Sequence, residues 1–510
     1  MNSSRLPSFF LVLFSVTSMF ASVAFGQVQH NAYGSLWSVG PGVTTELILE
    51  GTSEGTSAVT SVTVTLYSSE GSQLAVSTVN VPSQGVNRLT LSSILPQVGT
   101  TKQGGLSLTW TGAATAIRGK VQLNDDRGIS ASYLLRGGYR SDTQNALFAP
   151  WYFPSNSSEG QICLFNSSPA AIHVQIGLVQ NGAEQVGRTL TIQPKAMGTA
   201  DLRSILGQVS AGGATIGSLV LHYTGPVHSL EPSLLLSDPA SGFALMPEFL
   251  PLLAGNSTGQ TSWQFPDVPI ASATRASSGL GPTSYALISN PSGQTATIQL
   301  SAYSLRGART VQGDLPPADF GPYQTRLLPL NEISGFLSPT IGRVGLTVSH
   351  PGGAGKLAVS VFSVDRGGRT IAVPSGFVIS ASGSKISFWS AKVQPHNIVK
   401  YAVTAPGGVA PHVTLYYQSS TGVSSYTFPH QQVPEEASRM QFTIPSQSGR
   451  KDQLGNNFPE GATSGVLILA ASARTAQQIS ADQPNCAADC TEDDNLAAGL
   501  VVCLKQIVDY

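Results

Sequence analysis

The sequence predicts an all-β protein, a tandem array of about four β-sandwich modules. Its composition is typical of that class, with 53 glycines, 32 prolines and many short runs of Val, Ile, Leu and Thr. A hairpin pattern recurs along the chain, and rare tryptophans recur with it. Because unrelated residue types repeat at one period, we expect copies of a single structural unit.

The hairpin pattern is clearest in residues 173–192. Apolar and polar residues alternate into Asn181-Gly182, a pair that supplies the positive φ angles of a tight turn, and a second extended run follows. Counterparts surround Gly71, Gly307 and Gly422, at intervals of 111 to 125 residues between turn glycines. This pattern predicts one hairpin at the same place in every module.

Tryptophan marks the same period. Four of the five tryptophans stand where we expect modules to begin, and these are Trp37, Trp151, Trp263 and Trp389. Their recurrence favours a place in the sandwich core over a sugar-stacking surface. Late turns rich in Asp and Gly follow in the first three modules, at 125–128, 237–242 and 365–368.

These markers divide the chain into modules at 28–146, 147–256, 257–381 and 382–483. Each module of roughly 110 residues holds seven or eight short strands, which suits two packed sheets. A unit of that size buries its own core, so we expect independent modules joined like beads. The third module carries a glycine-rich insertion around 274–281, and the fourth lacks a match for the last strand.

Residues 1–26 have the pattern of a cleaved signal peptide. Arg5 gives a positive start, residues 9–20 are mostly apolar, and 24–26 offer small residues at the cleavage position, so the mature chain is expected to begin near Gln27. The apolar run is short for a membrane anchor, and no later segment is apolar enough to cross a membrane. We therefore expect a secreted or cell-surface protein with no transmembrane segment after signal cleavage.

The tail, residues 484–510, differs from the modules. Thr491-Glu-Asp-Asp494 resembles a capping box, and apolar residues from Leu496 to Val508 recur at helical spacing, which predicts a short amphipathic helix. Cys486, Cys490 and Cys503 are candidates for one disulfide, whose pairing the sequence does not fix. Cys163 lies in an apolar strand and is expected to be a buried thiol.

Charge and motif content narrow the function. Charged residues make up 11% of the chain and the net charge is −1, so the sequence offers no basic surface for nucleic acid or anionic lipid. Residues 51–55 match the G-x-S-x-G elbow of serine hydrolases, but a strand follows where that elbow requires a helix. The histidines lack metal-ligand spacing. We expect no catalytic residue, no metal and no cofactor.

The repeat pattern resembles the tandem immunoglobulin-like modules of extracellular and cell-surface proteins. That resemblance is architectural, and it implies an exported, non-catalytic structural or adhesive protein that contacts an extracellular protein or a polysaccharide surface. Two alternatives stay open: a glycan-binding protein that uses exposed aromatic residues, and a secreted enzyme with a site between modules.

Three aromatic residues are the ligand-binding candidates for the glycan alternative. Trp110 is the one tryptophan that does not repeat, although it shares a strand face with Leu106 and Leu108, which favours the core. Tyr416 and Tyr417 are the other two candidates. The N-x-S/T triplets at Asn156, Asn166 and Asn256 matter only if the host glycosylates exported proteins.

Overall fold

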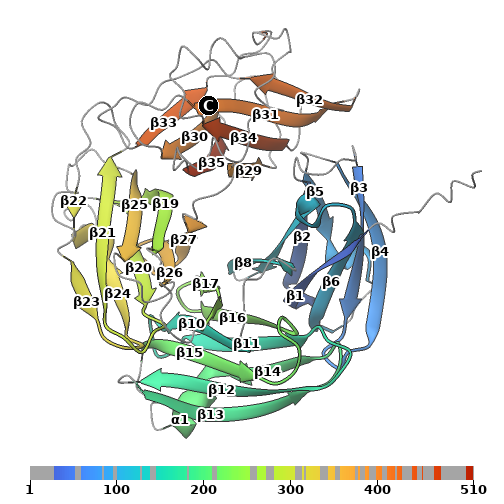
Figure 1. Cartoon of the computed structure of the whole chain (residues 1–510), viewed down its shortest axis with the longest axis vertical. Coiled ribbons are helices and arrows are strands. Elements are labelled where there is room, and N and C mark those ends of the chain that lie inside the picture. The colour runs from blue at the N-terminus through green and yellow to red at the C-terminus, as the bar shows by residue number, and fades with distance from the viewer. Residues whose placement is uncertain are drawn as a thin grey trace, which may run out of the picture.

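The protein is nearly all β. The computed structural model describes residues 28–51, 59–82, 86–95, 100–126, 129–137, 145–180, 183–209, 215–252, 261–271, 281–304, 313–314, 317–332, 343–350, 357–373 and 377–378, followed by residue 451 and the strands within 385–389, 398–404, 411–419, 422–427, 439–444, 465–471 and 501–508. These residues form antiparallel sheets, with a single short α-helix among them. The sheets face each other in pairs, and Figure 1 shows the pairs following one another around a common centre. The predicted all-β class is confirmed.

Two antiparallel sheets form the first sandwich. Its elements are β1 (Gln29–Val39), β2 (Val43–Gly51), β3 (Val59–Tyr67), β4 (Gln73–Pro82), β5 (Val86–Thr90), η1 (Leu91–Ser93), β6 (Lys102–Thr111), η2 (Ala114–Ala116), β7 (Ile117–Asp125), β8 (Ser130–Leu134) and β9 (Arg136–Gly137). The sheet orders are β4-β3-β6-β1-β9 and β5-β2-β7-β8. Alternate residues of facing strands, such as Leu47 and Leu49 of β2 and Val62 and Val64 of β3, are buried in one core, as period-2 patterning requires.

The second sandwich repeats this order strand for strand. Its elements are β10 (Ala146–Tyr152), β11 (Glu159–Asn166), β12 (Ile172–Gln180), β13 (Ala183–Ile192), β14 (Met197–Asp201), α1 (Leu202–Gln208), β15 (Ile216–Tyr223), β16 (Leu230–Asp238), β17 (Phe243–Leu245) and β18 (Leu250–Pro251). The sheet orders are β13-β12-β15-β10-β18 and β14-β11-β16-β17. Asp201 caps α1 by accepting a 2.7 Å hydrogen bond from the Ser204 backbone N–H.

The third sandwich follows the same plan. Its elements are β19 (Thr261–Pro269), β20 (Thr283–Ser289), β21 (Ala296–Ser304), β22 (Gly313–Asp314), β23 (Ala318–Phe320), β24 (Thr325–Pro329), η3 (Leu330–Glu332), β25 (Arg343–His350), β26 (Ala358–Val364), β27 (Thr370–Ala372) and β28 (Phe377–Val378). Its sheets run β22-β21-β25-β19-β28, with β23 also paired to β21, and β24-β20-β26-β27. The strands β20 and β26 therefore match β11 and β16, and β2 and β7.

The fourth sandwich takes its last strand from the tail. Its strands are β29 (Lys385–Trp389), β30 (Ile398–Thr404), β31 (Pro411–Ser419), β32 (Gly422–Thr427), β33 (Arg439–Ile444), β34 (Gly465–Ala471) and β35 (Val501–Val508), in the orders β29-β34-β31-β32 and β33-β30-β35. The predicted C-terminal helix is wrong over residues 501–508, where β35 pairs antiparallel with β30. This strand holds the place of β7, β16 and β26, and it lies beyond the module boundary predicted at residue 483.

The strand order differs from that of immunoglobulin domains. There the second strand pairs with the first and the fifth, whereas here β2 pairs with β5 and β7, and β1 pairs with β6. The cause is the short turn after β1, closed by hydrogen bonds between Gly40 and Val43, which carries the chain from one sheet to the other. The two packed antiparallel sheets agree with the prediction. Their strand pairing differs from that of the immunoglobulin-like modules that the repeat pattern resembles.

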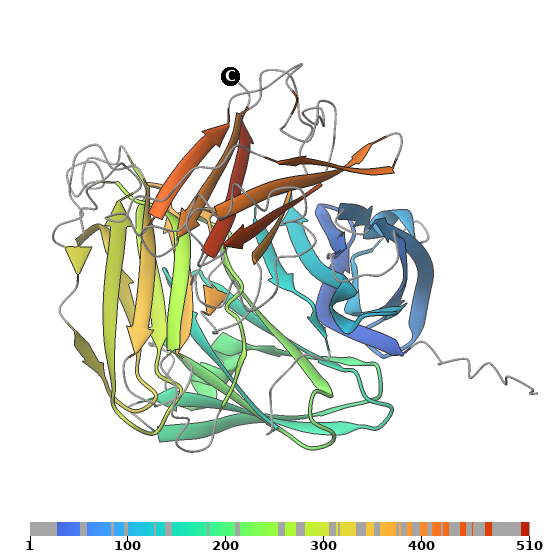
Figure 2. The same ribbon diagram turned by 45° about the horizontal axis from the view of Figure 1, so that its top comes forward.

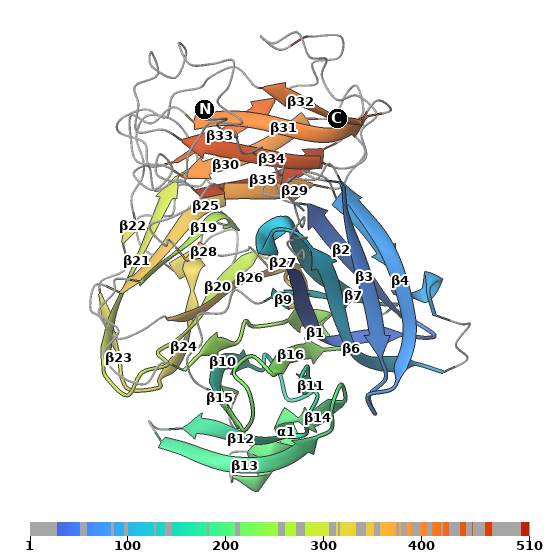
Figure 3. The same ribbon diagram turned by 45° about the vertical axis from the view of Figure 1, so that its right-hand side comes forward.

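One face of each later sandwich packs on the sandwich before it. The strand β1 contacts β11 and β16, β10 contacts β20 and β26, and β19 contacts β30 and β35. Figures 1 and 3 both show β11 and β16 lying between β12 and the first sandwich, and Figure 2 shows the orange and red strands of the fourth sandwich beside the yellow-green strands of the third. We call these contacts the first, second and third seams.

The first and second seams are mainly apolar and continuous with the cores, although Glu231 of β16 is buried in the first and Ser218 and Ser289 are buried in the second. Cys163 and Met197 of the second sandwich belong to the core of the first, and Leu287 and Phe362 of the third belong to the core of the second. The Met197 backbone N–H also donates a 2.9 Å hydrogen bond to the Ser69 carbonyl across the first seam. The first three sandwiches are therefore not beads, because their cores are joined.

Candidate functional site: the open face of the first sandwich

The face that forms the seams has a counterpart in the first sandwich that no described sandwich covers. In the second and third sandwiches it is the outer face of β14-β11-β16-β17 and of β24-β20-β26-β27. In the first it is the outer face of β5-β2-β7-β8, where no described strand of another sandwich makes a comparable contact with β2, β5 or β7. At the edge of this sheet β8 contacts β17 of the second sandwich, where Ala131 packs with Ala244. We call this surface the open face. It comprises Arg88 on β5, Glu46, Ile48 and Glu50 on β2, Arg118, Lys120, Gln122 and Asn124 on β7, and Ser130 and Ser132 on β8.

Three aspartates fix how the faces correspond. Asp125, Asp238 and Asp365 stand at or just after the ends of β7, β16 and β26, and the carboxylate of each accepts a backbone N–H within its turn. Counting back from them along the pairing registers aligns the strands residue by residue. The turn role expected for these aspartates is what the structure shows.

Charged and polar residues on the open face hold positions that are apolar or aromatic in the third sandwich. Glu46 corresponds to Tyr285, Arg88 to Leu327 and Gln122 to Phe362. All three counterparts pack against the core of the second sandwich. The same backbone position thus serves burial in one sandwich and contact with water in the other.

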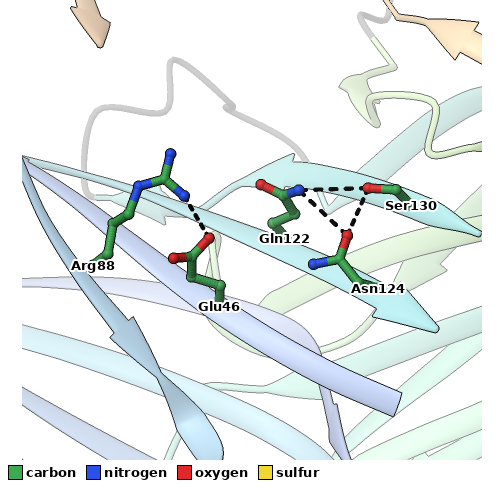
Figure 4. Close-up of polar contacts among 5 residues, drawn as sticks. All are labelled: Glu46, Arg88, Gln122, Asn124 and Ser130. Carbon is green, nitrogen blue, oxygen red and sulfur yellow. Dashed lines mark hydrogen bonds and ion pairs between the residues drawn. The ribbon is translucent and has the colours of Figure 1, made fainter. Parts of the chain in front are cut away.

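The polar side chains of the open face bind one another (Figure 4). An Arg88 guanidinium nitrogen lies 2.6 Å from a Glu46 carboxylate oxygen, with side-chain exposures of 40% and 24%. Beside this ion pair, the Ser130 hydroxyl donates to Asn124 Oδ1 at 2.8 Å, and the Gln122 amide donates to the same oxygen at 3.3 Å. These bonds orient donors and acceptors on a flat sheet surface.

Ile48 at the centre of the open face is only 7% exposed. Its cross-strand partners are Arg88 on one side and Lys120 on the other. Long basic side chains bury their methylene stems on apolar neighbours while their charged ends stay in water. Ile48 is therefore covered by its neighbours, and the surface that the open face presents is mainly polar and charged.

Burial shifts the titration of two groups on the open face. It raises the pKa of the Glu50 carboxyl to about 7, against the opposing effect of Arg118, Lys120 and Arg88. It also lowers the pKa of the Lys120 ammonium, although Glu50 opposes that change. Because the Glu50 carboxyl takes up a proton as the pH falls through 7, the net charge of the face becomes more positive there.

Among the described residues, no group of three His, Cys, Asp or Glu side chains lies close enough together to hold a metal ion. Within the same residues, no helix has the length and hydropathy needed to cross a bilayer. The site between modules expected of an enzyme would lie on the seams, whose described side chains are mainly apolar and include the buried Glu231, Ser218 and Ser289.

Of the three aromatic candidates for glycan binding, the structure describes the side chain of Trp110 alone. Trp110 is 2% exposed in the core of the first sandwich, where its indole N–H donates to the Ala113 carbonyl at 3.0 Å. It is not available to stack on a sugar. Tyr416 and Tyr417 lie on β31, and their side chains fall outside the described residues.

Of the four cysteines, the structure describes the side chain of Cys163 alone. Cys163 is a free, fully buried thiol, as predicted, and burial raises its pKa to about 12. Cys503 lies on β35, while Cys486 and Cys490 fall outside the described residues, as do the signal peptide and most of the 274–281 insertion. The disulfide among the three tail cysteines stays a prediction.

Sequence reasoning missed the open face, although the sequence carries a signal for it. Residues 46–50 of β2 read Glu-Leu-Ile-Leu-Glu, with charges at both ends, whereas residues 162–165 of β11 are apolar throughout. A strand buried on both faces loses its alternation. This contrast distinguishes a sheet face that meets water from one that lies in a seam.

No known protein family and no curated protein matches the sequence. Among solved structures, the crystal structure of Salmonella alpha-2-macroglobulin reacted with methylamine aligns with 87% of this chain and 30% of its own, at 9% identity and a TM-score of 0.12. The chain thus spans less than a third of that protein. A TM-score this low does not indicate a shared fold, so the match supports no conclusion about structure or function.

Proposed function

We propose that the protein is an exported, non-catalytic structural or adhesive protein that presents the open face to a partner outside the cell. The observation that carries this proposal is the open face itself. It matches the faces that make the seams, yet it meets water and carries five charged residues in a chain with 11% charged residues.

The joined cores support a structural role. Phe148, Val220 and Leu250 of the second sandwich belong to the core of the third, so each of these sandwiches shares apolar residues with its neighbours. Such contacts fix the relative orientation of the first three sandwiches, where short linkers alone would leave them free to move. A rigid scaffold holds a contact surface at a defined distance and angle from the rest of the chain.

The partner we propose is an extracellular protein or polysaccharide surface rich in hydrogen-bonding groups. Gln122, Asn124 and Ser130 offer amide and hydroxyl groups, and Arg88 and Lys120 offer charged donors. Polar contacts of this kind give specificity and a salt-dependent rate of association.

The test uses the gene in its own host. The full chain with a C-terminal epitope tag should be found in the medium or at the cell surface, and deletion of the gene should reduce attachment of cells to surfaces or to one another severalfold. A cytoplasmic location, or attachment unchanged by the deletion, would refute the proposal.

Complementation with variants then tests the open face. Arg88→Ala with Lys120→Ala should fail to restore attachment, whereas Arg188→Ala, which removes an exposed arginine on β13, should restore it. Secretion and circular dichroism of each variant show whether it folds. Full rescue by the folded double variant would show that the contact lies elsewhere on the molecule.

A further inference from the structure

Each seam is formed by two surfaces, or halves, one from each of the two sandwiches that meet there. The first and the fourth sandwich each have one such surface that forms no seam with another described sandwich. We call the half made by the outer face of β11 and β16, or of β20 and β26, the acceptor half. The donor half lies on the preceding sandwich, where β1, β10 or β19 makes the contact. The open face is the unused acceptor half, and β29 in the fourth sandwich holds the place of an unused donor half.

The backbone of the fourth sandwich retains the donor pattern. Trp37 pairs across strands with Gly104, Trp151 pairs with Gly217, and Trp389 pairs with Gly465. In the first two sandwiches the residue after that glycine lies in the seam, because Gly105 lies against Phe165 and the Ser218 hydroxyl lies 2.8 Å from that of Ser289. Val466, an apolar residue, holds this position in the fourth.

A donor half at one end and an acceptor half at the other would allow copies of the chain to add head to tail. Such a head-to-tail interface produces open filaments unless its rotation closes a ring. The open face opposes this association through its side chains. Covering the face with a second copy would remove the Glu46–Arg88 ion pair and Lys120 from water without new partners, and this desolvation opposes the contact.

We propose that the open face is an acceptor half closed to a second copy of this chain by its charged side chains. Terminal repeats of solenoid proteins use polar outer faces for the same purpose. This inference goes beyond the proposed function and does not rest on it, because it concerns self-association of the purified chain. An adhesive role could fail while the inference holds, and the reverse is equally possible.

The experiment gives the first sandwich the residues of the third. The triple variant Glu46→Tyr, Arg88→Leu and Gln122→Phe places on the open face the side chains found at Tyr285, Leu327 and Phe362. Sedimentation velocity of the purified mature chain should show a monomer for the wild type. The variant should show an open series of dimers, trimers and longer species whose average mass rises with concentration.

Two controls separate docking from general stickiness. The same side chains introduced at exposed positions of β13, as Gln185→Phe, Arg188→Leu and Thr189→Tyr, should not produce the ordered series. Restoring Arg88 alone in the triple variant should shift the species back toward monomer, because one buried guanidinium without its carboxylate partner opposes the contact.

Three outcomes overturn the inference. The triple variant, folded by circular dichroism, remains monomeric at all concentrations; or it forms only a closed dimer, which would mean that two open faces meet; or the wild type already forms head-to-tail species. Should the triple variant fail to fold, the double variant Arg88→Leu and Gln122→Phe is read by the same three criteria.

Discussion

Phe165 of the second sandwich lies directly against Gly105 of the first. A Cβ atom added at Gly105 would lie 2.0 Å from the Phe165 ring carbon Cδ2, closer than any side chain permits. In the second seam the corresponding pair is Ser289 and Ser218, whose hydroxyl oxygens are 2.8 Å apart. One seam therefore sets a large residue against a glycine, and the other sets two small polar residues against each other.

This contact predicts that Gly105→Ala destabilises the protein by about 2 kcal/mol, because the ring of Phe165 must shift within a filled seam. Urea unfolding monitored by tryptophan fluorescence measures the change. Gly207→Ala in α1 is the matched control, since a Cβ there meets nothing within 4 Å and alanine favours the helix by up to about 1 kcal/mol. Equal stability of Gly105→Ala and wild type would contradict the seam geometry.

Cys163 should report opening of the first seam. It belongs to the second sandwich, yet it is buried in the core of the first, with its pKa raised to about 12 by burial. We expect no maleimide labelling of the native protein at neutral pH, and faster labelling in Gly105→Ala, because thiolate and exposure are both required. Mass spectrometry of the peptide that contains Cys163 follows the reaction. Labelling of native Cys163 at the rate of a free thiol would show that the seam does not protect it.

Asn166 and Asn290 should be structural. The side-chain amide of Asn166 donates to the carbonyls of Ala170, Ile192 and Gln193, and Asn290 makes the matching three bonds in the next sandwich. Replacing either by Ala leaves buried carbonyls without donors, for a loss of about 3 kcal/mol in the free energy of unfolding. Asn156→Ala, at an exposed position, is the control and should cost little.

The same bonds predict where glycosylation fails. In a host that modifies N-x-S/T triplets, Asn166 should stay unmodified in the folded protein because it is fully buried, whereas Asn156 is exposed. Glycopeptide mapping of the secreted chain distinguishes the two sites. A glycan on Asn166 would mean that modification precedes folding of this turn.

Glu50 should make stability depend on pH. Its carboxyl has an ordinary pKa of 4.5 in the unfolded chain and a pKa of about 7 in the folded one, so the folded chain holds the proton over this window. Stability therefore falls as the pH rises from 4.5 to 7, by about 1–3 kcal/mol. Glu50→Gln should match the wild type at pH 4 and exceed it at pH 8 in urea unfolding. An unchanged pH profile would show that Glu50 stays hydrated.

The sequence predicted the strands because their signal is local. Alternation over residues such as 59–67, and turn residues between such runs, define a strand without knowledge of its neighbours. Contacts between sandwiches leave no such local signal in the sequence. Phe165 and Leu287 are apolar residues within already apolar strands, so only comparison of β11 and β20 with β2 shows that a second face of the sheet is buried.

Trp263 shows how a periodic marker misleads. Trp37, Trp151 and Trp389 each pair with a glycine, but Trp263 pairs with Val348, and Val268 lies at the place of the other tryptophans beyond the bulge in β19. In the third module 44 residues separate Trp263 from the hairpin glycine Gly307, against 31 to 34 in the other modules, and this displacement accounts for part of the difference.

The tail was misread for a related reason. Leu504, Ile507 and Val508 have helical spacing, but Val501, Val502 and Ile507 are β-branched and suit a strand equally well. Periodicity over eight residues does not decide between the two. The missing last strand of the fourth module was the better signal, because β30 needed a partner.

The repeated seam also bears on how such a chain changes in length during evolution. The second and third sandwiches each carry a donor half and an acceptor half, so a duplicated gene segment encoding either one would insert between its neighbours with both contacts satisfied. The first sandwich has no such freedom, since its charged outer sheet would meet an apolar surface if it were moved inward. Lengthening by whole units is therefore expected through duplication of the segments for the second and third sandwiches rather than of the segment for residues 28–137.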